Sequence, residues 1–369
     1  MKISAVEAIV LRLPSVTTAA DGTQDTCLIR VDTDAGITGW GEVDSAPTVV
    51  KAIVDAPLSH QLANGLANAL RGADPLDRAG CRERMDKAVN FYGRVGVGVH
   101  AMAGIDVALW DIAGKSAGKS VSDLFGAAPS QRIRAYASLL FGDTPAETGE
   151  RARRFADAGF SAIKFGWGPM GRSAREDLEL VREASLGAGK HVTVLVDAGQ
   201  VWDWETALKR AEAFTEFNIG FLEEPLAPDD LTGYRRLSER SPLPIATGEA
   251  ESQVPAFQRL LECGVNYVQP DPGRCGITTM VEVGRRAHEY GAGTINHTFK
   301  SGISIAASLH ALAAIGGGEF FEYCVVDSPL RHEVTAERFP VIDGLLAVPA
   351  GPGLGITVVD ETIERYRVA

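Results

Sequence analysis

The amino-acid sequence predicts an α/β protein: a (β/α)8-type barrel, in a modified TIM form, with an N-terminal α+β capping domain that the C-terminal tail completes. From Ile133 onward, short apolar runs alternate with helical stretches. Polar or charged residues close these runs at intervals of 33, 26, 26, 22, 26 and 25 residues counted from Lys164. A strand with its crossover helix needs roughly that length. Residues 1–125 lack this rhythm, which separates the two parts.

The N-terminal part has the pattern of strands followed by helices. Residues 3–13 alternate like a strand, and residues 27–32 and 37–43 are predicted to pair across a turn at 33–36. The small, polar segment 15–24 is predicted to be a loop. Helices are predicted at 48–70, 75–89 and 97–116, the last of them apolar on most sides and therefore buried.

The barrel is predicted from eight apolar runs, most of which end in side chains able to do chemistry. The ends lie near Ser138, Lys164, Asp197, Glu223, Glu249, Asp271, His297 and Glu322. A doubly wound open sheet is the alternative, but it would gather such residues at one switch point. We therefore predict a capping domain at 1–125, a barrel at 126–340 and a segment at 341–369 that returns to the capping domain.

The composition is that of a globular protein, with 45% hydrophobic and 23% charged residues among 369. The formal net charge of −12 argues against binding to nucleic acid or to an anionic membrane. The sequence shows no signal segment and no apolar run of about eighteen residues, so no membrane span is predicted. Five scattered cysteines without a CxxC pair fit a reducing compartment, and a cytoplasmic location is predicted.

Three acidic residues that each close an apolar run predict a metal site. Asp197, Glu223 and Glu249 are separated by 26 residues in both cases, so they should end successive parallel strands at one rim. Carboxylates gathered there repel one another unless a cation joins them, and ligation by oxygen alone suits Mg²⁺. The alternative is three unrelated helix N-caps, which the equal spacing disfavours.

The remaining strand ends predict acid–base chemistry. Asp271 and His297 should end neighbouring strands, where the carboxylate would fix the imidazole tautomer and make His297 a general base. Lys164 could bind an anionic substrate, act as a base or form a Schiff base. Glu322 is a candidate electrophile or hydrogen-bond donor. A divalent ion that holds a carboxylate substrate would make its α-proton acidic enough for imidazole to remove, giving an enediolate.

Four motifs occur together across nearly the whole chain. They are Gly104-Ile105-Asp106-Val107-Ala108-Leu109-Trp110-Asp111-Ile112-Ala113-Gly114-Lys115, Glu223-Glu224-Pro225-Leu226, Thr247-Gly248-Glu249 and Pro352-Gly353-Leu354-Gly355. With them the chain resembles the enolase superfamily, and within it the mandelate racemase subgroup. The resemblance implies Mg²⁺ on the three strand-end acids, an Asp271–His297 dyad, and a hydrogen bond from Glu322 to the substrate carboxylate or enediolate. It also implies that capping segments near 15–24 and 45–50 close over the substrate, and that the protein is a homo-oligomer.

Two departures from the subgroup pattern bear on the reaction. The subgroup usually carries Lys-x-Lys at the second strand, but here the second lysine position is Gly166, so the base on one face is missing. Racemisation needs a base on each face and is therefore disfavoured. Gly199 stands where the subgroup often has Asn, so a polar contact near the metal or substrate should be missing or replaced by water. Trp167, as a substrate-binding residue, and Trp202 are expected to narrow the pocket.

Together these inferences predict an Mg²⁺-dependent acid sugar dehydratase, a hydro-lyase that converts an aldonate or aldarate to its 2-keto-3-deoxy acid. Lys164 would bind the substrate carboxylate. An aldarolactone cycloisomerase is the alternative enzyme, because it starts with the same proton removal and expels a ring oxygen. A Schiff-base aldolase would leave the three carboxylates unexplained, and an inactive barrel that only binds a ligand is favoured by Gly166 alone. The predicted partner is a small carboxylate or its lactone.

Overall fold

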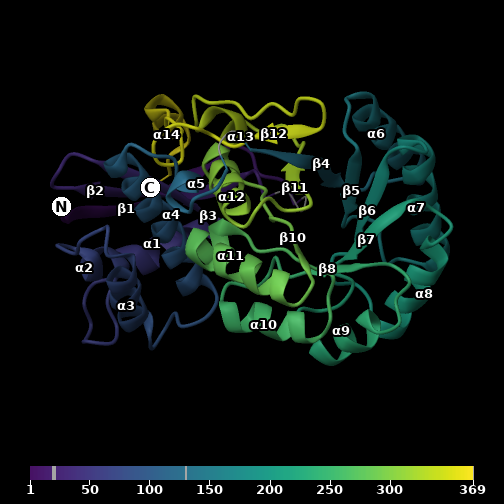
Figure 1. The fold of residues 1–369 in the computed structure, drawn as a ribbon, viewed down its shortest axis with the longest axis horizontal. Coiled ribbons are helices and arrows are strands. Elements are labelled where there is room, and N and C mark those ends of the chain that lie inside the picture. The colour runs from purple at the N-terminus through teal and green to yellow at the C-terminus, as the bar shows by residue number, and fades with distance from the viewer. Residues whose placement is uncertain (19–21, 129–130, 369) are drawn as a thin grey trace.

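The computed structural model describes residues 1–18, 22–128 and 131–368. Figure 1 shows two parts, a cap that holds the N-terminus and a larger curved sheet wrapped by helices. The cap contains an antiparallel sheet of β1 (Ile3–Arg12), β2 (Asp25–Thr33) and β3 (Thr38–Val43), in that order. These strands confirm the predicted strand and hairpin. Part of the predicted 15–24 loop, residues 19–21, lies outside the described residues.

Helices complete the cap, and one prediction about them is wrong. They are α1 (Pro47–Asp55), α2 (Leu66–Leu70), α3 (Arg78–Val89), α4 (Val97–Ala117) and α5 (Val121–Leu124). The sequence predicts a single helix over 48–70, but the chain leaves the helix at Ala56, with ψ 134°. Ala56 precedes Pro57, and a residue before proline is pushed out of the helical region. The chain then folds back so closely that a Cβ on Gly65 would lie 2.1 Å from the Ala56 carbonyl oxygen.

Helix α4 is the apolar centre of the cap. By length and composition alone it could cross a membrane. It is instead buried against β3 and against α11 (Pro272–Glu289) of the barrel, and Ile105, Leu109 and Ile112 are almost fully covered. A Cβ on Gly41 of β3 would lie 1.9 Å from the Gly104 carbonyl oxygen, so glycine is needed for this approach. Packing therefore accounts for the apolar composition of α4.

The larger part is the predicted barrel. Its parallel strands are β4 (Arg132–Leu140), β5 (Ala162–Gly166), β6 (Thr193–Asp197), β7 (Ile219–Glu223), β8 (Ile245–Thr247), β9 (Tyr267–Val268), β10 (Gly293–Thr294) and β11 (Phe321–Cys324). Hydrogen bonds connect them in the order β10-β9-β8-β7-β6-β5-β4-β11. The helices between them are α6 (Pro145–Asp157), α7 (Ala174–Ala188), α8 (Trp204–Phe214), α9 (Leu231–Ser238), α10 (Val254–Glu262), α11 and α12 (Gly302–Ala314). In Figure 1, α6 to α10 form an arc around the outside of the sheet.

The last unit of the barrel departs from a regular strand–helix repeat. After β11 the chain forms the short α13 (Pro329–Glu333) and then β12 (Leu345–Ala347), which pairs antiparallel with β4. The hydrogen-bonded strand order ends at β10 and β11, and the side chain of Asn296 spans these two ends. Its amide oxygen accepts from the Glu322 N–H at 2.9 Å, and its amide nitrogen donates to the Glu322 carbonyl oxygen at 3.4 Å. At this seam a side chain supplies the bonds that a backbone ladder supplies elsewhere.

Apolar side chains fill the barrel interior below the strand ends. The cluster consists of Tyr136, Ala162, Leu195, Phe221, Ala246, Ile295 and Phe320. Tyr136 packs edge-on against Phe221 and Phe320. The interior is therefore a packed floor, which leaves chemistry to the residues at and beyond the C-terminal strand ends.

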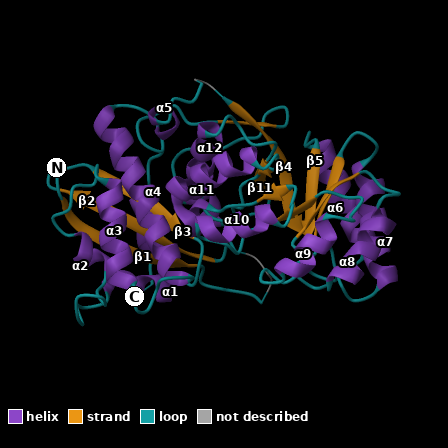
Figure 2. Cartoon of the chain, turned by 60° about the horizontal axis from the view of Figure 1, so that its bottom comes forward, coloured by secondary structure: helices purple, strands orange, loops and turns teal. Residues whose placement is uncertain are grey.

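The C-terminal segment contacts both parts of the molecule. At one end of this segment, β12 pairs with β4 of the barrel. At the other end, Arg367 follows α14 (Asp360–Tyr366) and forms an antiparallel β-bridge with Leu11 of β1. The Arg367 side chain donates to the Glu7 carboxylate at 2.6 Å. Figure 2 shows the two groups of strands at opposite ends of the molecule, with α11 and α12 between them. The region boundaries at 125 and 340 stay predictions.

Glu42 of β3 joins the cap to the beginning of α12. Its buried carboxylate accepts hydrogen bonds from the hydroxyls of Ser301 at 2.6 Å and Ser304 at 2.9 Å, and from both backbone N–H groups. The Thr26 hydroxyl adds a bond at 2.7 Å. A carboxylate is stabilising at a helix N-terminus, so the cap supplies the N-terminal charge of a barrel helix.

We expect Glu42→Ala to lower the free energy of unfolding by about 3 kcal/mol, because it leaves several buried donors without an acceptor. Urea denaturation measures the change. Glu7→Ala is the matched control, since it removes a partly exposed carboxylate from the same sheet and should cost at most about 1 kcal/mol. Equal losses in the two variants would show that the Glu42 contacts contribute nothing beyond those of a surface ion pair.

Candidate active site

A cavity of about 130 Å³ lies where the C-terminal ends of the barrel strands meet the cap. Five residues that the sequence predicts as site residues line it: Lys164, Trp167, Asp197, Glu249 and His297. The other three, Glu223, Asp271 and Glu322, are buried and bonded to lining residues. The structure therefore brings all the predicted site residues to one place.

The three acids of the predicted metal site come together as the spacing predicts. Asp197 and Glu223 are the last residues of β6 and β7, and Glu249 lies just beyond β8. One carboxylate oxygen of each lies within 4.8 Å of the others. Burial, and then the neighbouring Glu223, raise the pKa of Asp197 well above its usual value, which shows how poorly the cluster tolerates its charge.

The donor set of this cluster fits Mg²⁺. All the candidate ligand atoms are carboxylate oxygens, which hard divalent ions prefer. The Glu223 Oε2 atom is buried and has no hydrogen-bond partner, although such atoms are normally satisfied. A cation held by Asp197, Glu223 and Glu249 would supply the missing partner.

Lys164 lies among the acids rather than at the end of its strand. It is the third residue of β5, its Nζ donates to Glu223 Oε1 at 2.5 Å, and it lies 2.6 Å from Glu322 Oε1. Burial opposes the charge, but Glu223 and Glu322 raise the pKa of Lys164 well above its usual value. A Schiff base requires a neutral amine, so this environment disfavours the aldolase alternative.

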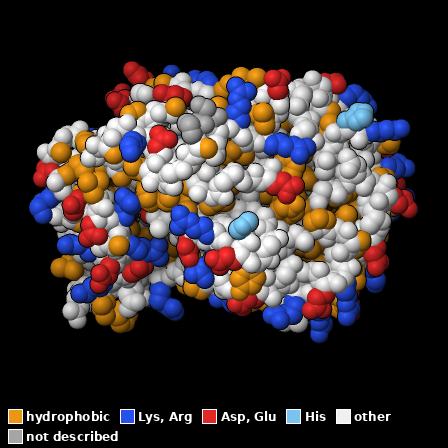
Figure 3. Space-filling model, viewed as in Figure 1, with side chains coloured by type: hydrophobic (Ala, Val, Ile, Leu, Met, Phe, Trp, Pro, Cys, Tyr) orange, Lys and Arg blue, Asp and Glu red, His pale blue; other side chains and the backbone are white. Residues whose placement is uncertain are grey.

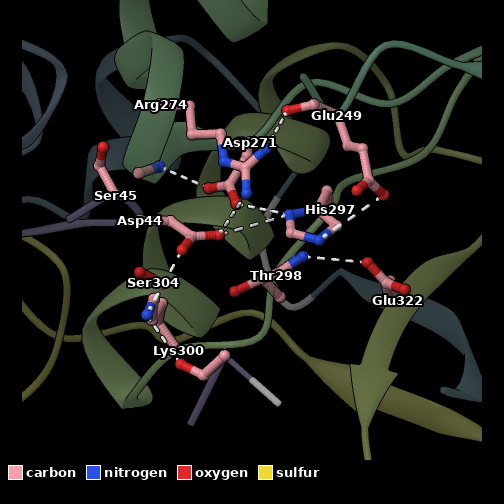
Figure 4. Close-up of polar contacts among 12 residues, drawn as sticks. Asp44, Ser45, Glu249, Asp271, Arg274, His297, Thr298, Lys300, Ser304 and Glu322 are labelled. Carbon is pink, nitrogen blue, oxygen red and sulfur yellow. Dashed lines mark hydrogen bonds and ion pairs between the residues drawn. The ribbon is translucent and has the colours of Figure 1, made fainter. Parts of the chain in front are cut away.

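Asp271 and His297 form the expected pair, which Figure 4 shows beside Glu249. Asp271 is the N-cap of α11, where Oδ1 accepts from the Gly273 N–H at 2.6 Å. The other oxygen, Oδ2, lies 2.7 Å from His297 Nδ1. This bond fixes the orientation of the His297 imidazole ring. The other ring nitrogen, Nε2, lies 3.7 Å from Glu249 Oε2.

The charge around His297 favours the imidazolium. Burial alone would lower its pKa, but Glu249, Asp271 and Glu322 raise the pKa of His297 to about 10. Because Glu249 contributes the largest of these raising effects, a cation shared with Glu249 would offset much of it and bring the pKa down.

Glu322 sits between the lysine and the loop that follows His297. Its Oε1 accepts from the Ser138 hydroxyl at 2.8 Å, and its Oε2 accepts from the Thr298 N–H at 3.1 Å. Burial raises the pKa of Glu322, but Lys164 and His297 outweigh burial and hold it below its usual value. An ionised Glu322 only accepts hydrogen bonds, so the donor role expected from the sequence requires a bound anion that raises this pKa.

Sequence reasoning missed Asp44, a residue of the cap that reaches the barrel site. Asp44 follows β3 directly. Its Oδ2 lies 3.3 Å from Arg274 Nη2 and 3.8 Å from His297 Nδ1. Its Oδ1 lies 3.4 Å from Lys300 Nζ (Figure 4). Arg274 and Lys300 hold the pKa of Asp44 well below its usual range, against the effect of burial. The one available signal was an acid directly after a strand, next to the 45–50 segment expected to close over the substrate.

Lys300 ties the cap to the loop that carries the base. Its Nζ donates to the carbonyl oxygens of Gly22 at 2.7 Å and Asp25 at 2.9 Å. Gly22 in turn lines the cavity beside Phe299, whose ring stacks on His297 at a centroid distance of 5.6 Å. The cap therefore contributes both wall and charge to the site.

Trp167 and Gly199 form one unit at the ends of β5 and β6. Trp167 lines the cavity, is 40% exposed and adopts φ 59°. A Cβ on Gly199 would lie 3.1 Å from the indole Cδ2 atom, so the glycine found in place of Asn gives room to the tryptophan. The expectation that Trp202 narrows the pocket is wrong, because Trp202 is buried beside Phe214 and is not among the lining residues.

Gly166 is sterically coupled to the metal cluster. A Cβ at this position would lie 2.7 Å from Asp197 Oδ2 and 2.9 Å from its Cβ. We expect Gly166→Ala to displace Asp197 and to weaken Mg²⁺ binding by about tenfold, the effect of roughly 1.4 kcal/mol. Calorimetric titration with Mg²⁺ measures the affinity, and urea denaturation of the same variant serves as the control for folding. An unchanged Mg²⁺ affinity would contradict the coupling.

The fold and the site define a capped barrel with a carboxylate triad facing an Asp–His pair. Two family models match the chain: "Mandelate racemase / muconate lactonizing enzyme, N-terminal domain" over residues 4–126, and "Enolase C-terminal domain-like" over residues 147–362. The chain therefore belongs to the enolase superfamily, in its mandelate racemase and muconate lactonizing enzyme group. This confirms the resemblance and the fold class inferred from the sequence.

Curated relatives of the chain act on sugar acids or their lactones. The chain is 28% identical over 359 residues to a D-galactarolactone cycloisomerase from Agrobacterium fabrum, covering 92% of this chain and 91% of that protein. It is 32% identical over 291 residues to an arabinonate dehydratase from Saccharolobus solfataricus, covering 77% of each. These two relatives belong to different reaction classes.

Solved structures agree along the whole chain. A protein described as a predicted mandelate racemase from Rhodobacter sphaeroides has a TM-score of 0.92 at 35% identity, covering 100% of this chain and 95% of that one. A racemase from Streptomyces coelicolor with bound magnesium has a TM-score of 0.87 at 27% identity, covering 99% and 100%.

Proposed function

We propose that this protein is an Mg²⁺-dependent acid sugar dehydratase that forms a 2-keto-3-deoxy acid. The carrying observation is that His297, held by Asp271, lies beside the Asp197–Glu223–Glu249 cluster, whereas Gly166 stands at the position of the second base. A one-base site supports elimination and disfavours racemisation. Relatives that include a dehydratase and a cycloisomerase of sugar acids support the substrate class.

The side chains divide the work as follows. The ammonium of Lys164 orients the substrate carboxylate, and His297 Nε2 removes the α-proton. Asp197, Glu223 and Glu249 would hold Mg²⁺, which would supply stabilisation of the negative charge that develops on that carboxylate. The imidazolium of His297 then returns the proton to the departing β-hydroxyl, so that water leaves and the enol product tautomerises to the 2-keto-3-deoxy acid. Glu322 holds Lys164 and Thr298 in place through the bonds described above.

The test is a screen of aldonates, aldarates and their lactones with Mg²⁺, read out as 2-keto-3-deoxy product. We expect at least one open-chain acid to lose water. A lactone that opens without loss of water would favour the cycloisomerase alternative, which the Agrobacterium relative supports. Absence of any reaction across the panel would favour an inactive barrel that only binds a ligand.

The surface is consistent with a small-molecule partner. On the face in Figure 3, acidic and basic side chains are interspersed rather than gathered by sign. Together with the net charge of −12, this gives no support to nucleic-acid binding. Homo-oligomerisation and a cytoplasmic location stay predictions.

A further inference from the structure

We propose that the substrate carries a single carboxylate and that its far end is uncharged, so that the enzyme selects an aldonate over the matching aldarate. This inference rests on the proposed function and narrows its substrate class. The main structural support is an apolar wall of the cavity, which we define as Leu139, Leu140, Gly166, Trp167 and Phe299. All five residues line the cavity.

The apolar wall lies at the ends of β4 and β5 and on the loop after His297. Leu139 and Leu140 are the last two residues of β4, Gly166 is the last residue of β5, and Trp167 follows it. The ring of Trp167 packs beside Gly199, Phe299 stacks on His297, and a Cβ on Gly22 would lie 3.2 Å from the Phe299 Cβ. The C–H groups of a sugar can pack on such rings. A carboxylate there would lose its hydration without gaining a partner.

The cations near the cavity are already matched by anions. Lys164, which binds the substrate carboxylate in the proposed function, forms ion pairs with Glu223 and Glu322. Arg274 is paired with Asp44 and donates to the Glu249 carbonyl oxygen at 2.8 Å. Among the lining residues that the structure describes, these two and His297 are the basic side chains.

Lys300 lies beside the described lining residues and adds no free positive charge. Lys300, 5% exposed, uses its ammonium on two carbonyl oxygens of the cap and lies 3.4 Å from Asp44. A second carboxylate would therefore meet the apolar wall without a counter-charge. Leaving one charged group unpaired weakens binding by about 10- to 100-fold.

The test compares aldonates with aldarates of the same configuration. The His297→Asn protein, saturated with Mg²⁺, is titrated calorimetrically with D-galactonate and galactarate, D-gluconate and D-glucarate, and D-mannonate and D-mannarate. We expect the aldonate to bind at least about tenfold more tightly in each pair that binds. Equal or tighter binding of the aldarates would overturn the proposal and would point to Arg274, whose buried Nε has no hydrogen-bond partner, as a second carboxylate site.

A second variant changes the wall itself. Leu140→Arg should shift the aldarate-to-aldonate affinity ratio by about tenfold toward the aldarate, because it adds a cation to the wall. Leu140→Met is the matched control, of similar length and without charge, and should leave the ratio unchanged. The same shift in both variants would contradict the proposal.

The outcomes separate this inference from the proposed function. If the wild-type enzyme dehydrates aldarates more efficiently than aldonates, the function stands and the inference fails. If aldonates bind preferentially but no 2-keto-3-deoxy product forms, the inference stands and the dehydratase assignment fails. If no acid of any pair binds, both fail.

Discussion

Removal of divalent ions with EDTA is expected to abolish turnover, with a loss of at least about 10³-fold, and added Mg²⁺ should restore it. The reason is that the α-proton of a carboxylate is too weakly acidic for an imidazole unless the developing charge is stabilised by several kcal/mol. Initial rates before chelation, after chelation and after Mg²⁺ addition measure the effect. Undiminished turnover in EDTA would remove the metal from the proposed mechanism.

Asp197→Asn sharpens the same prediction with a readout that does not depend on substrate. Asp197 is buried, lies 3.8 Å from Lys164, and faces Glu223 and Glu249. Its neutralisation relieves repulsion in the metal-free protein. We therefore expect a melting temperature without Mg²⁺ equal to or above that of wild type, together with loss of the stabilisation that Mg²⁺ gives. Glu216→Gln, an exposed acid near the cluster in sequence, should keep both activity and the Mg²⁺ response.

His297→Asn is expected to lower kcat by about 10²- to 10⁴-fold and to abolish exchange of the substrate α-proton in D₂O, because His297 is the base that removes this proton in the proposed mechanism. Binding of an acid sugar should persist, since Lys164 and the acid cluster are untouched. NMR of the α-proton signal measures exchange separately from elimination. Exchange at the wild-type rate would show that another group is the base.

His288→Asn is the control for this experiment, because it replaces an exposed histidine of α11 far along the helix from Asp271. It should leave both exchange and turnover at wild-type levels.

Asp271→Asn should have a smaller effect than His297→Asn. His297 remains in this variant, but the hydrogen-bond acceptor that fixes its tautomer is weakened. We expect a loss in kcat with little change in substrate affinity.

The metal cluster could be predicted from sequence because its acids recur at equal intervals in a repeating strand–helix unit. Asp197 and Glu223 end strands of a repeating unit, so equal spacing along the chain becomes proximity at one rim. The position of Glu249 shows the limit of this reasoning, since β8 ends at Thr247 and the acid lies on the loop beyond it. The apolar runs predict which residues lie close together, but they do not predict at which residue the backbone hydrogen bonds of each strand end.

The contribution of the cap could not be predicted, because it depends on contacts between residues far apart in sequence. Asp44 meets Arg274 and Lys300 more than two hundred residues later, and Glu42 meets the beginning of α12. No local pattern encodes such pairings. The helix break before Pro57 is different, because the effect of a proline on the preceding Ala56 is a local signal in the sequence.

Gly166 has a consequence for how this enzyme could have diverged from relatives with two bases. The atoms that a lysine would add at this position begin with a Cβ that collides with Asp197. A single substitution that introduced a lysine here would therefore move Asp197, a residue of the proposed Mg²⁺ site. We therefore expect a change of reaction type at position 166 to be non-additive with substitutions around Asp197.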